Sequence, residues 1–314
     1  MIIVDELKNR ALILNSRPDG YPDESNFKLI EIDIPELNPG EFIVKILWLS
    51  VDPYMRGRMS DKKSYAPSVE IGDVMVGGAV GKIISSRNTE FEVGDLVEGR
   101  FGWQEYAISN GMNARKLTIN ESDISKALGA LGMPGLTAYF GLFSLGRPIP
   151  NDTVVISAAS GAVGAVVGQL AKLSGCKVVG IVGSDPKAMY IKNELNFDYV
   201  INYKKEDVCK RLLEICPNGI DIYFDNVGGE ILEAVLENLA FRARIVVCGQ
   251  IAQYNLANDE VAHGITNFRN ILTNQATVEG FIVSRFASDF PQAYSFLERL
   301  YTDGKLKTKE DIII

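Results

Sequence analysis

TVVISAASGAVGAVVGQLAKLSGCKVVGIV, residues 153–182, is the stretch that decides the fold. Residues 153–159 are short and apolar and predict a buried strand, and residues 161–174 repeat apolar side chains at helical spacing. Gly175 stands where a helix C-terminal cap belongs, and KVVGIV at 177–182 predicts a second strand. A strand, a glycine-containing turn, a helix and another strand together indicate a parallel α/β sheet.

The same alternation continues along the second part of the chain. Further strands are predicted at 199–202, 221–224, 244–248 and 278–283, with helices near 187–195, 205–215, 230–239 and 289–303. Six strands separated by helices predict a doubly wound parallel sheet that is covered on both faces, the Rossmann arrangement.

Residues 1–125 have a different sequence pattern. Apolar runs rich in Ile and Val are separated by the turn sequences RPDGYPDES at 17–25 and PELNPGE at 35–41. No long helical period is visible in this part of the chain. We therefore expect a compact, mostly β domain, such as a partly open barrel, to precede the α/β domain.

Composition limits the class of protein. Apolar residues make up 46% and charged residues 23% of the 314 residues, which excludes a disordered chain. A net charge of −8 does not favour nucleic acid or an anionic membrane as partner. The start MIIVDELKNR does not resemble a signal peptide, and no apolar run reaches the ~18 residues of a membrane span.

The cysteines and the histidine argue against a metal site. Cys176, Cys209, Cys216 and Cys248 are widely spaced without a CxxC pair, and His263 is the sole histidine. Zinc sites need such ligands at close spacing. We predict no protein metal site, and the cysteine usage favours a reducing, cytoplasmic location.

The turn at 159–164 has the spacing of a dinucleotide fingerprint, with alanine at its first glycine position. Gly161 would let the backbone approach a pyrophosphate, and Gly164 would let the helix pack close to the sheet. The helix N-terminus offers free N–H groups to phosphates. The alternative is that the small residues serve helix–sheet packing alone.

The end of the second predicted strand bears on which dinucleotide is bound. NAD sites usually place an acidic residue there to accept from the ribose hydroxyls. Asp185, followed by Pro186, is interpreted here as a helix N-cap, which leaves Lys187 and Tyr203 to hold a 2′-phosphate. This favours NADP(H); the rival interpretation is that Asp185 binds the ribose and Lys187 is merely solvated.

Several longer motifs resemble one known family. They are AASGAVGAVVGQLAK (158–172), GSDPK (183–187), FDNVGG (224–229), CGQIAQYN (248–255) and VEGFIV (278–283), together with VDPYMRGRMS (51–60), FGWQEYA (101–107) and GMPGLTAY (132–139). These sequences are similar to the zinc-independent medium-chain dehydrogenase/reductases, in the leukotriene B4 dehydrogenase/prostaglandin reductase and curcumin reductase branch. The similarity runs nearly from end to end.

The resemblance implies a GroES-like domain at 1–125 and a Rossmann domain at 126–303. Family members continue beyond the position of Ile314 and complete the β domain, so 304–314 are expected to return to it. The implied activity is NADPH-dependent reduction of the C=C bond of α,β-unsaturated aldehydes and ketones by a cytoplasmic homodimer. A quinone reductase of the same superfamily and a non-catalytic nucleotide-binding protein remain alternatives.

The resemblance also implies site residues. Those expected to bind NADP(H) are Thr137, Gly161, Ala162, Val163, Gly164, Lys187, Tyr203, Asn226, Cys248, Gly249, Gln250, Ile251, Tyr254, Phe281, Ile282 and Val283.

Tyr254 is the predicted catalytic residue. Hydride addition to an enone builds negative charge on the carbonyl oxygen, and a phenol O–H aimed at that oxygen would stabilise it. The alternative is a loop tyrosine that only packs on the cofactor. Apolar walls for the substrate are expected from Tyr54, Trp103 and Met133, with Phe101 and Phe140 as weaker candidates, against simple core packing. Arg56 and Arg58 are either steering charges for a carboxylate or solvated side chains.

Overall fold

The computed structural model describes residues 7–314, which divide into two compact units. The first unit comprises residues 7–128 with Tyr254–Glu260, and the second comprises Gly129–Gln253 with Val261–Ile314.

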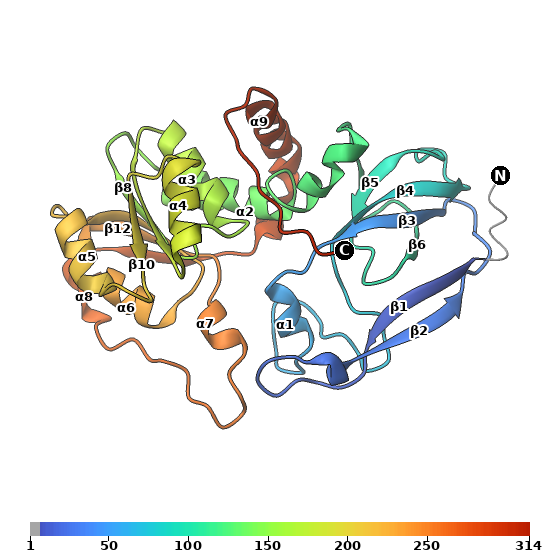
Figure 1. Ribbon diagram of the computed structural model, residues 1–314, viewed down its shortest axis with the longest axis horizontal. Coiled ribbons are helices and arrows are strands. Elements are labelled where there is room, and N and C mark those ends of the chain that lie inside the picture. Colours follow the sequence, from blue (N-terminus) through green and yellow to red (C-terminus); the bar gives the residue numbers. More distant parts are fainter. Residues whose placement is uncertain (1–6) are drawn as a thin grey trace. The chain divides into compact units, whose positions relative to one another are not determined.

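The first unit is mostly β structure, as expected (Figure 1). A five-stranded antiparallel sheet has the order β6-β3-β4-β5-β7, and β1 pairs with β2 in a separate two-stranded sheet. Apolar side chains of the larger sheet, including Phe42, Ile83 and Val97, form its buried core. Its elements are β1 Lys8–Leu14, β2 Phe27–Asp33, β3 Phe42–Leu49, α1 Tyr54–Arg58, β4 Ala79–Ser86, β5 Leu96–Gly99, β6 Tyr106–Ser109, β7 Ala114–Lys116 and a 3-10 helix at Glu121–Leu128.

The second unit has the predicted Rossmann architecture. Its strands are β8 Thr153–Ile156, β9 Lys177–Val182, β10 Tyr199–Asn202, β11 Ile220–Asp225, β12 Leu239–Val247 and β13 Thr277–Gly280. Its helices are α2 Met133–Phe140, a π-helical turn Gly141–Gly146, α3 Gly164–Leu173, α4 Asp185–Asn193, α5 Val208–Ile215, α6 Gly229–Leu236, α7 Ile251–Tyr254 (whose last residue groups with the first unit), α8 Arg269–Thr273 and α9 Phe290–Thr302.

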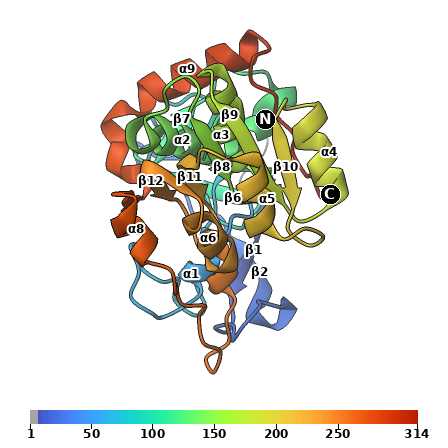
Figure 2. The same cartoon turned by 90° about the vertical axis from the view of Figure 1, so that its left-hand side faces the viewer.

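The six strands are all parallel and have the order β10-β9-β8-β11-β12-β13. The chain therefore reverses its direction of travel across the sheet between β8 and β11, which are neighbours (Figure 2). In open sheets of this order, ligands bind outside the carboxyl ends of the strands at that switch point.

Helices cover both faces of this sheet, and the alternation along β9 shows how. Val178 and Val182 pack in one apolar core with side chains of α3, α4 and α9. Val179 and Ile181 point to the other face and pack with side chains of α5 and α6. A strand buried on both faces explains why its sequence is continuously apolar.

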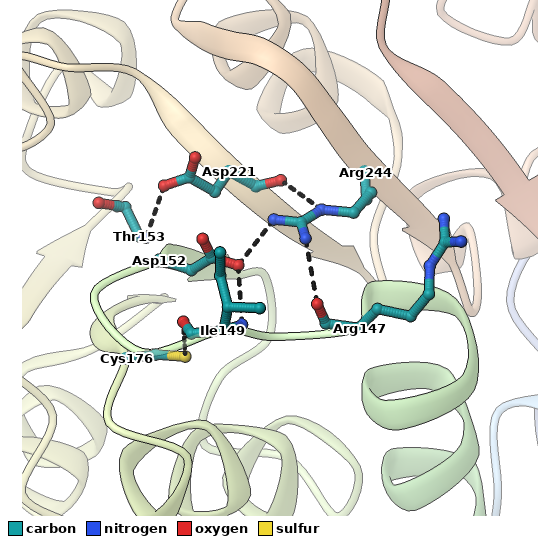
Figure 3. A network of polar contacts seen from close by, with 7 residues as sticks. All are labelled: Arg147, Ile149, Asp152, Thr153, Cys176, Asp221 and Arg244. Atoms are coloured by element: carbon teal, nitrogen blue, oxygen red, sulfur yellow. Dashed lines mark hydrogen bonds and ion pairs between the residues drawn. The ribbon is translucent and has the colours of Figure 1, made fainter.

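A network of hydrogen bonds and an ion pair lies at the end of the sheet where β8 and β13 begin (Figure 3). Arg244 donates from Nη2 to Asp152 Oδ2 at 2.7 Å and from Nη1 to the Arg147 carbonyl oxygen at 3.1 Å. Asp221 accepts from the Thr153 N–H at 2.8 Å. The Asp152 side chain is 8% exposed and that of Arg244 18%, so this ion pair is largely removed from water.

Residues 304–314 group with the second unit, and their expected return to the first domain stays a prediction. The Gln169 side chain of α3 accepts from the Lys307 N–H at 2.8 Å and donates to the Lys307 carbonyl oxygen at 3.0 Å. This two-way pairing mimics a strand neighbour and holds the segment against α3.

Across residues 7–314, no single helix is long and apolar enough to cross a membrane, although Glu121–Leu128 and Met133–Gly146, bent by 49°, satisfy the length and composition test as a pair.

Candidate active site

Except for Thr137 and Tyr254, the predicted cofactor residues all lie at the carboxyl-terminal edge of the parallel sheet in the second unit. Each follows the carboxyl end of a parallel strand: Gly161 to Gly164 after β8, Lys187 after β9, Tyr203 after β10, Asn226 after β11, Cys248 to Ile251 after β12, and Phe281 to Val283 after β13. Because the strands are parallel, these segments meet at a single edge of the sheet.

The loop between β8 and α3 is shaped to receive an anion. The Gly161 N–H donates to the Ala158 carbonyl oxygen at 2.9 Å, which makes a tight turn. A Cβ on Gly164 would lie 2.5 Å from that same oxygen, so only glycine lets α3 start this close to the strand. Among residues 7–314, nothing accepts from the N–H groups of Ala162 and Val163. Unpaired N–H groups at a helix N-terminus favour a bound anion.

A second polar group lies where β9 and β10 end. A Cβ on Gly183 would be 3.0 Å from Tyr203 Oη, so the phenol ring packs directly over the end of β9. The Lys187 side chain is exposed in the first turn of α4. The structure corrects the predicted N-cap of α4: Ser184, and not Asp185, accepts from the Lys187 N–H, and Asp185 is the first helical residue.

A buried carboxylate organises the end of β11. Asp225 is fully buried, and its Oδ1 accepts from Tyr223 Oη at 2.8 Å and from the Gly228 N–H at 2.9 Å. Asn226 is tied to the β8 end, because its Nδ2 donates to the Ser157 carbonyl oxygen at 2.8 Å. Burial raises the pKa of Asp225, and these hydrogen bonds oppose the rise.

Cys248 and Gly249 donate from their backbone N–H groups to the Asp225 carbonyl oxygen at 2.8 and 3.1 Å. Burial raises the pKa of the Cys248 thiol to about 12, so it is a packed thiol rather than a nucleophile. Gln250 packs over Gly228, where a Cβ would be 3.3 Å from the Gln250 side chain. Ile251, in contrast, is exposed.

The other predicted residues of the second unit have mixed surroundings. Phe281 is buried in the core, Ile282 is exposed and Val283 is half-buried. Thr137 is buried in α2, and its hydroxyl donates to the Met133 carbonyl oxygen at 2.8 Å.

The predicted catalytic Tyr254 is grouped with the first unit. The segment that it begins is held there by the Asn258 N–H, which donates to Asp19 Oδ1 at 2.8 Å. Burial raises the pKa of Tyr65, and the nearby Tyr254 raises it further. Burial likewise raises the pKa of Tyr54, with a smaller contribution from Tyr65. Tyr65 is therefore within electrostatic reach of both Tyr54 and Tyr254.

Sequence reasoning did not single out Tyr65. It stands 189 positions before Tyr254 in a segment without periodicity, and no local pattern could indicate that the two lie close. The tyrosine's aromatic character among polar residues, in DKKSYAPS at 61–68, was the only available signal.

Among the other predicted substrate contacts, Trp103 is half-buried, whereas Phe101 and Phe140 are buried. Trp103 packs over Gly77 and lies 5.4 Å from the Phe27 ring, and its Nε1 is buried without a hydrogen-bond partner in residues 7–314. The two weaker candidates are core residues: Phe101 lies in the sheet core of the first unit, and Phe140 stacks on Phe286 at 4.7 Å.

Arg56 is half-buried and is bound by backbone carbonyl groups. Its guanidinium donates to the carbonyl oxygens of Pro18 and Gly20 at 3.0–3.1 Å, and so fixes the loop before β2.

Comparisons with known proteins agree with this architecture. Residues 10–117 match the family described as the N-terminal domain of oxidoreductase, and 162–299 match that described as zinc-binding dehydrogenase. The NADPH-dependent curcumin reductase of Escherichia coli (strain K12) is 43% identical over 282 residues, which cover 88% of this chain and 81% of that protein. The chain belongs to the zinc-independent medium-chain dehydrogenase/reductases.

Two other members of these reductases are similar along almost all of the chain. The NADP(+)-dependent 2-alkenal reductase of Nicotiana tabacum is 40% identical over 317 residues, covering 99% of this chain and 91% of its own. The crystal structure of CurA in complex with NADPH from Vibrio vulnificus is 42% identical, covers 97% of this chain and 91% of that one, and has a TM-score of 0.91.

Within residues 7–314, no three His, Cys, Asp or Glu side chains lie close enough together to hold a metal ion.

Proposed function

We propose that this medium-chain reductase uses NADPH to reduce the C=C bond of α,β-unsaturated aldehydes and ketones, by hydride transfer without a metal ion. The observation that carries the proposal is the β8–α3 loop at the switch point of the sheet, where the Ala162 and Val163 N–H groups have no acceptor within residues 7–314. Close relatives named for curcumin and 2-alkenals supply the substrate class.

The residues at this edge fit NADPH. The free N–H groups of Ala162 and Val163, with no room for a side chain at Gly164, suit a pyrophosphate. The exposed Lys187 and the Tyr203 hydroxyl suit a 2′-phosphate, which gains from one positive charge and one donor. Asn226, Cys248 to Ile251, and Phe281 to Val283 would line the nicotinamide half, and Thr137 would lie near it.

NADPH, when bound, supplies the hydride that adds to the β-carbon of the substrate. Tyr254 is proposed to donate a hydrogen bond to the carbonyl oxygen, which becomes an enolate oxygen as the hydride adds. Such a donor acts best when it is oriented before the reaction. The proton that completes reduction then reaches the α-carbon from solvent or through the Tyr254 hydroxyl.

The half-buried Tyr54, Trp103 and Met133 are proposed as apolar walls for the enone, with Tyr65 added because of its proximity to Tyr254. Aromatic walls exclude water and orient a conjugated substrate.

The activity is tested by steady-state oxidation of NADPH with a 2-alkenal, an α,β-unsaturated ketone and a benzoquinone. We expect turnover with the alkenal and the ketone, and a saturated carbonyl as the product. Turnover with the quinone alone would replace the proposal by a quinone reductase, and tight NADPH binding without any turnover would indicate a non-catalytic protein.

The role of Tyr254 is tested by Tyr254→Phe. Removal of one oxyanion donor costs ~2.7–4 kcal/mol in comparable sites, so kcat is expected to fall about 10²–10³-fold while NADPH affinity stays within about twofold. Tyr21→Phe, at a 79% exposed position of the same unit, is the matched control. Wild-type turnover in Tyr254→Phe would remove this phenol from the mechanism.

We also propose a homodimer formed through β13. This strand ends the sheet and is exposed along its whole length, with Val278 47% and Leu272 of the preceding helix 77% exposed. A free strand edge beside apolar side chains favours pairing with a second copy. Val278→Lys should convert the dimer to monomer in sedimentation velocity; a wild-type monomer at the same concentration would contradict the proposal.

A cytoplasmic location is proposed because Cys176, Cys209, Cys216 and Cys248 are all free thiols. Fractionation of cells with an antibody to the protein tests it.

A further inference from the structure

A chain of hydrogen bonds runs from the buried ends of β8 and β11 to α7, the short helix that ends at Tyr254. It begins at the side chains of Asp225 and Ser157, which are both fully buried, and the proposed mechanism gives neither of them a part in the reaction. A donor to an enolate oxygen acts best when it is oriented before the reaction. The groups that hold α7 therefore bear on the function of its phenol.

The Asp225 carboxylate gathers its donors on one oxygen. Oδ1 accepts from the Tyr223 hydroxyl at 2.8 Å and from the Ser157 hydroxyl at 3.2 Å. It also accepts from the Val227 and Gly228 N–H groups at 3.0 and 2.9 Å. Oδ2, in contrast, has no hydrogen-bond partner in residues 7–314. The position of Oδ1 therefore fixes the turn that follows β11.

Ser157, the residue after β8, binds the same turn from the neighbouring strand. Its hydroxyl accepts from the Asn226 N–H at 2.8 Å, and its carbonyl oxygen accepts from Asn226 Nδ2 at 2.8 Å. A hydroxyl can donate one hydrogen bond while it accepts another, so Ser157 links Asn226 to the Asp225 carboxylate. The Phe224 carbonyl oxygen, at 3.4 Å, is the more distant acceptor for the same proton. Residues 226–228 are thus held from both β8 and β11.

The turn supplies the acceptors for the start of α7. The Ile251 N–H donates to the Asn226 carbonyl oxygen at 3.3 Å. The Ala252 N–H donates to the Val227 carbonyl oxygen at 3.1 Å. The first N–H groups of a helix have no partner within it, so these bonds both satisfy them and set the position of the helix. Tyr254 is the last residue of that helix, and displacement of the turn should therefore displace its phenol.

We propose that Asp225 and Ser157 are positioning residues for Tyr254: they fix the turn at 226–228, whose carbonyl oxygens hold α7 and thereby set the direction of the phenol. This inference rests on the proposed function, in which Tyr254 donates to the enolate oxygen. Asp225 and Ser157 neither touch the substrate nor transfer a proton. Their effect on turnover therefore passes entirely through Tyr254.

A double-mutant cycle on kcat tests this dependence. Ser157→Ala removes two hydrogen bonds with little change in volume, and we expect kcat to fall about tenfold because the phenol is no longer held in place. The NADPH affinity from fluorescence titration should stay within about threefold. In the Tyr254→Phe background, where the phenol hydroxyl is absent, Ser157→Ala should change kcat by less than about twofold.

Two substitutions test Asp225. Asp225→Asn keeps an acceptor oxygen at the Oδ1 position and places its amide nitrogen where Oδ2 has no partner, so kcat should stay within about threefold of wild type. Asp225→Ala leaves four donors without their acceptor and should lower kcat at least about tenfold. Thermal unfolding checks that each variant is folded, and the Ser157→Ala cycle decides the matter if Asp225→Ala does not fold.

The matched control is Ser174→Ala, which removes a serine hydroxyl that donates to the Leu170 carbonyl oxygen at 2.9 Å at the end of α3. It should change neither kcat nor NADPH affinity. Equal losses of kcat from Ser157→Ala with and without the Tyr254 hydroxyl would overturn the inference, and so would an Asp225→Asn variant as slow as Asp225→Ala. Wild-type turnover in Tyr254→Phe, or no turnover in the wild-type protein, would instead contradict the proposed function itself.

Discussion

The two ends of the six-stranded sheet differ in how their polar groups are satisfied. At the end where β8 and β13 begin, Arg244, Asp152 and Asp221 bond to one another or to nearby backbone, and the groups are largely buried. At the carboxyl end, the N–H groups of Ala162 and Val163 have no acceptor within residues 7–314. The paired groups where β8 and β13 begin stabilise the sheet. The carboxyl end, called the open end below, keeps unpaired N–H groups that can bind a ligand.

This contrast separates stability from function within a single sheet. An unpaired backbone N–H is tolerated only when solvent or a ligand can reach it. A buried ion pair, in contrast, is costly to break, because the partner left behind keeps its charge away from water. Substitutions where β8 and β13 begin should therefore lower mainly the free energy of unfolding, and substitutions at the carboxyl end should lower mainly the NADPH affinity.

Asp152→Ala should have the largest effect on stability. It leaves the Arg244 guanidinium without its carboxylate, and removal of one partner from such a buried pair costs about 3 kcal/mol in the free energy of unfolding. Urea unfolding measures this change, and NADPH affinity should stay unchanged. Lys305→Ala, which breaks an exposed pair with Asp303, is the control and should cost under about 0.5 kcal/mol. Equal losses of unfolding free energy in Asp152→Ala and Lys305→Ala would show that the buried pair contributes no more than an exposed one.

Gly164→Ala tests the open end. The added Cβ would lie 2.5 Å from the Ala158 carbonyl oxygen and 2.9 Å from Ala159 Cα, both backbone atoms, so α3 has to move. We expect a loss of about 1–2 kcal/mol in stability and at least about tenfold in NADPH affinity, measured by fluorescence titration. Gly264→Ala adds a methyl group where no atom lies within 4 Å and should change neither quantity. NADPH binding that survives Gly164→Ala would show that the loop does not hold the pyrophosphate.

Glu233 of α6 should give the smallest effect. Hydrogen bonds from the Thr266 hydroxyl, the Thr266 N–H and His263 lower the pKa of Glu233 to about 2 from 4.5. A carboxylate with a depressed folded pKa stabilises the fold above its unfolded pKa, and this contribution is lost as pH falls toward 2.

The difference in melting temperature between wild type and Glu233→Gln should therefore be constant above about pH 5 and shrink between pH 4.5 and 2. A difference that grows on acidification would show that Glu233 is not the group responsible.

Strands bounded by turns were predictable from the sequence, and short elements were not. KVVGIV at 177–182 was assigned to the residue, since it is apolar and ends at turn-forming residues. Helix α1, Tyr54–Arg58, was missed because five residues are fewer than two helical turns and show no apolar period.

The candidate site was predictable where residues follow strands, because strand order places their ends together. It was not predictable where residues of distant segments influence one another. Tyr65 and Tyr254 are an example, and so is Arg56, whose guanidinium was expected to face a substrate or solvent but binds loop carbonyls. At Asp185, sequence preference favoured an N-cap, yet Ser184 is the N-cap and the Asp185 carboxylate pairs with Asn202 and Lys205.

The grouping of Tyr254–Glu260 with residues 7–128 has a consequence for protein engineering. A chimera made by joining at Leu128 would inherit its predicted catalytic phenol from the donor of the other half, because that residue is encoded more than a hundred positions later. Recombination between related reductases should therefore exchange 254–260 together with the amino-terminal module, as a two-piece cassette.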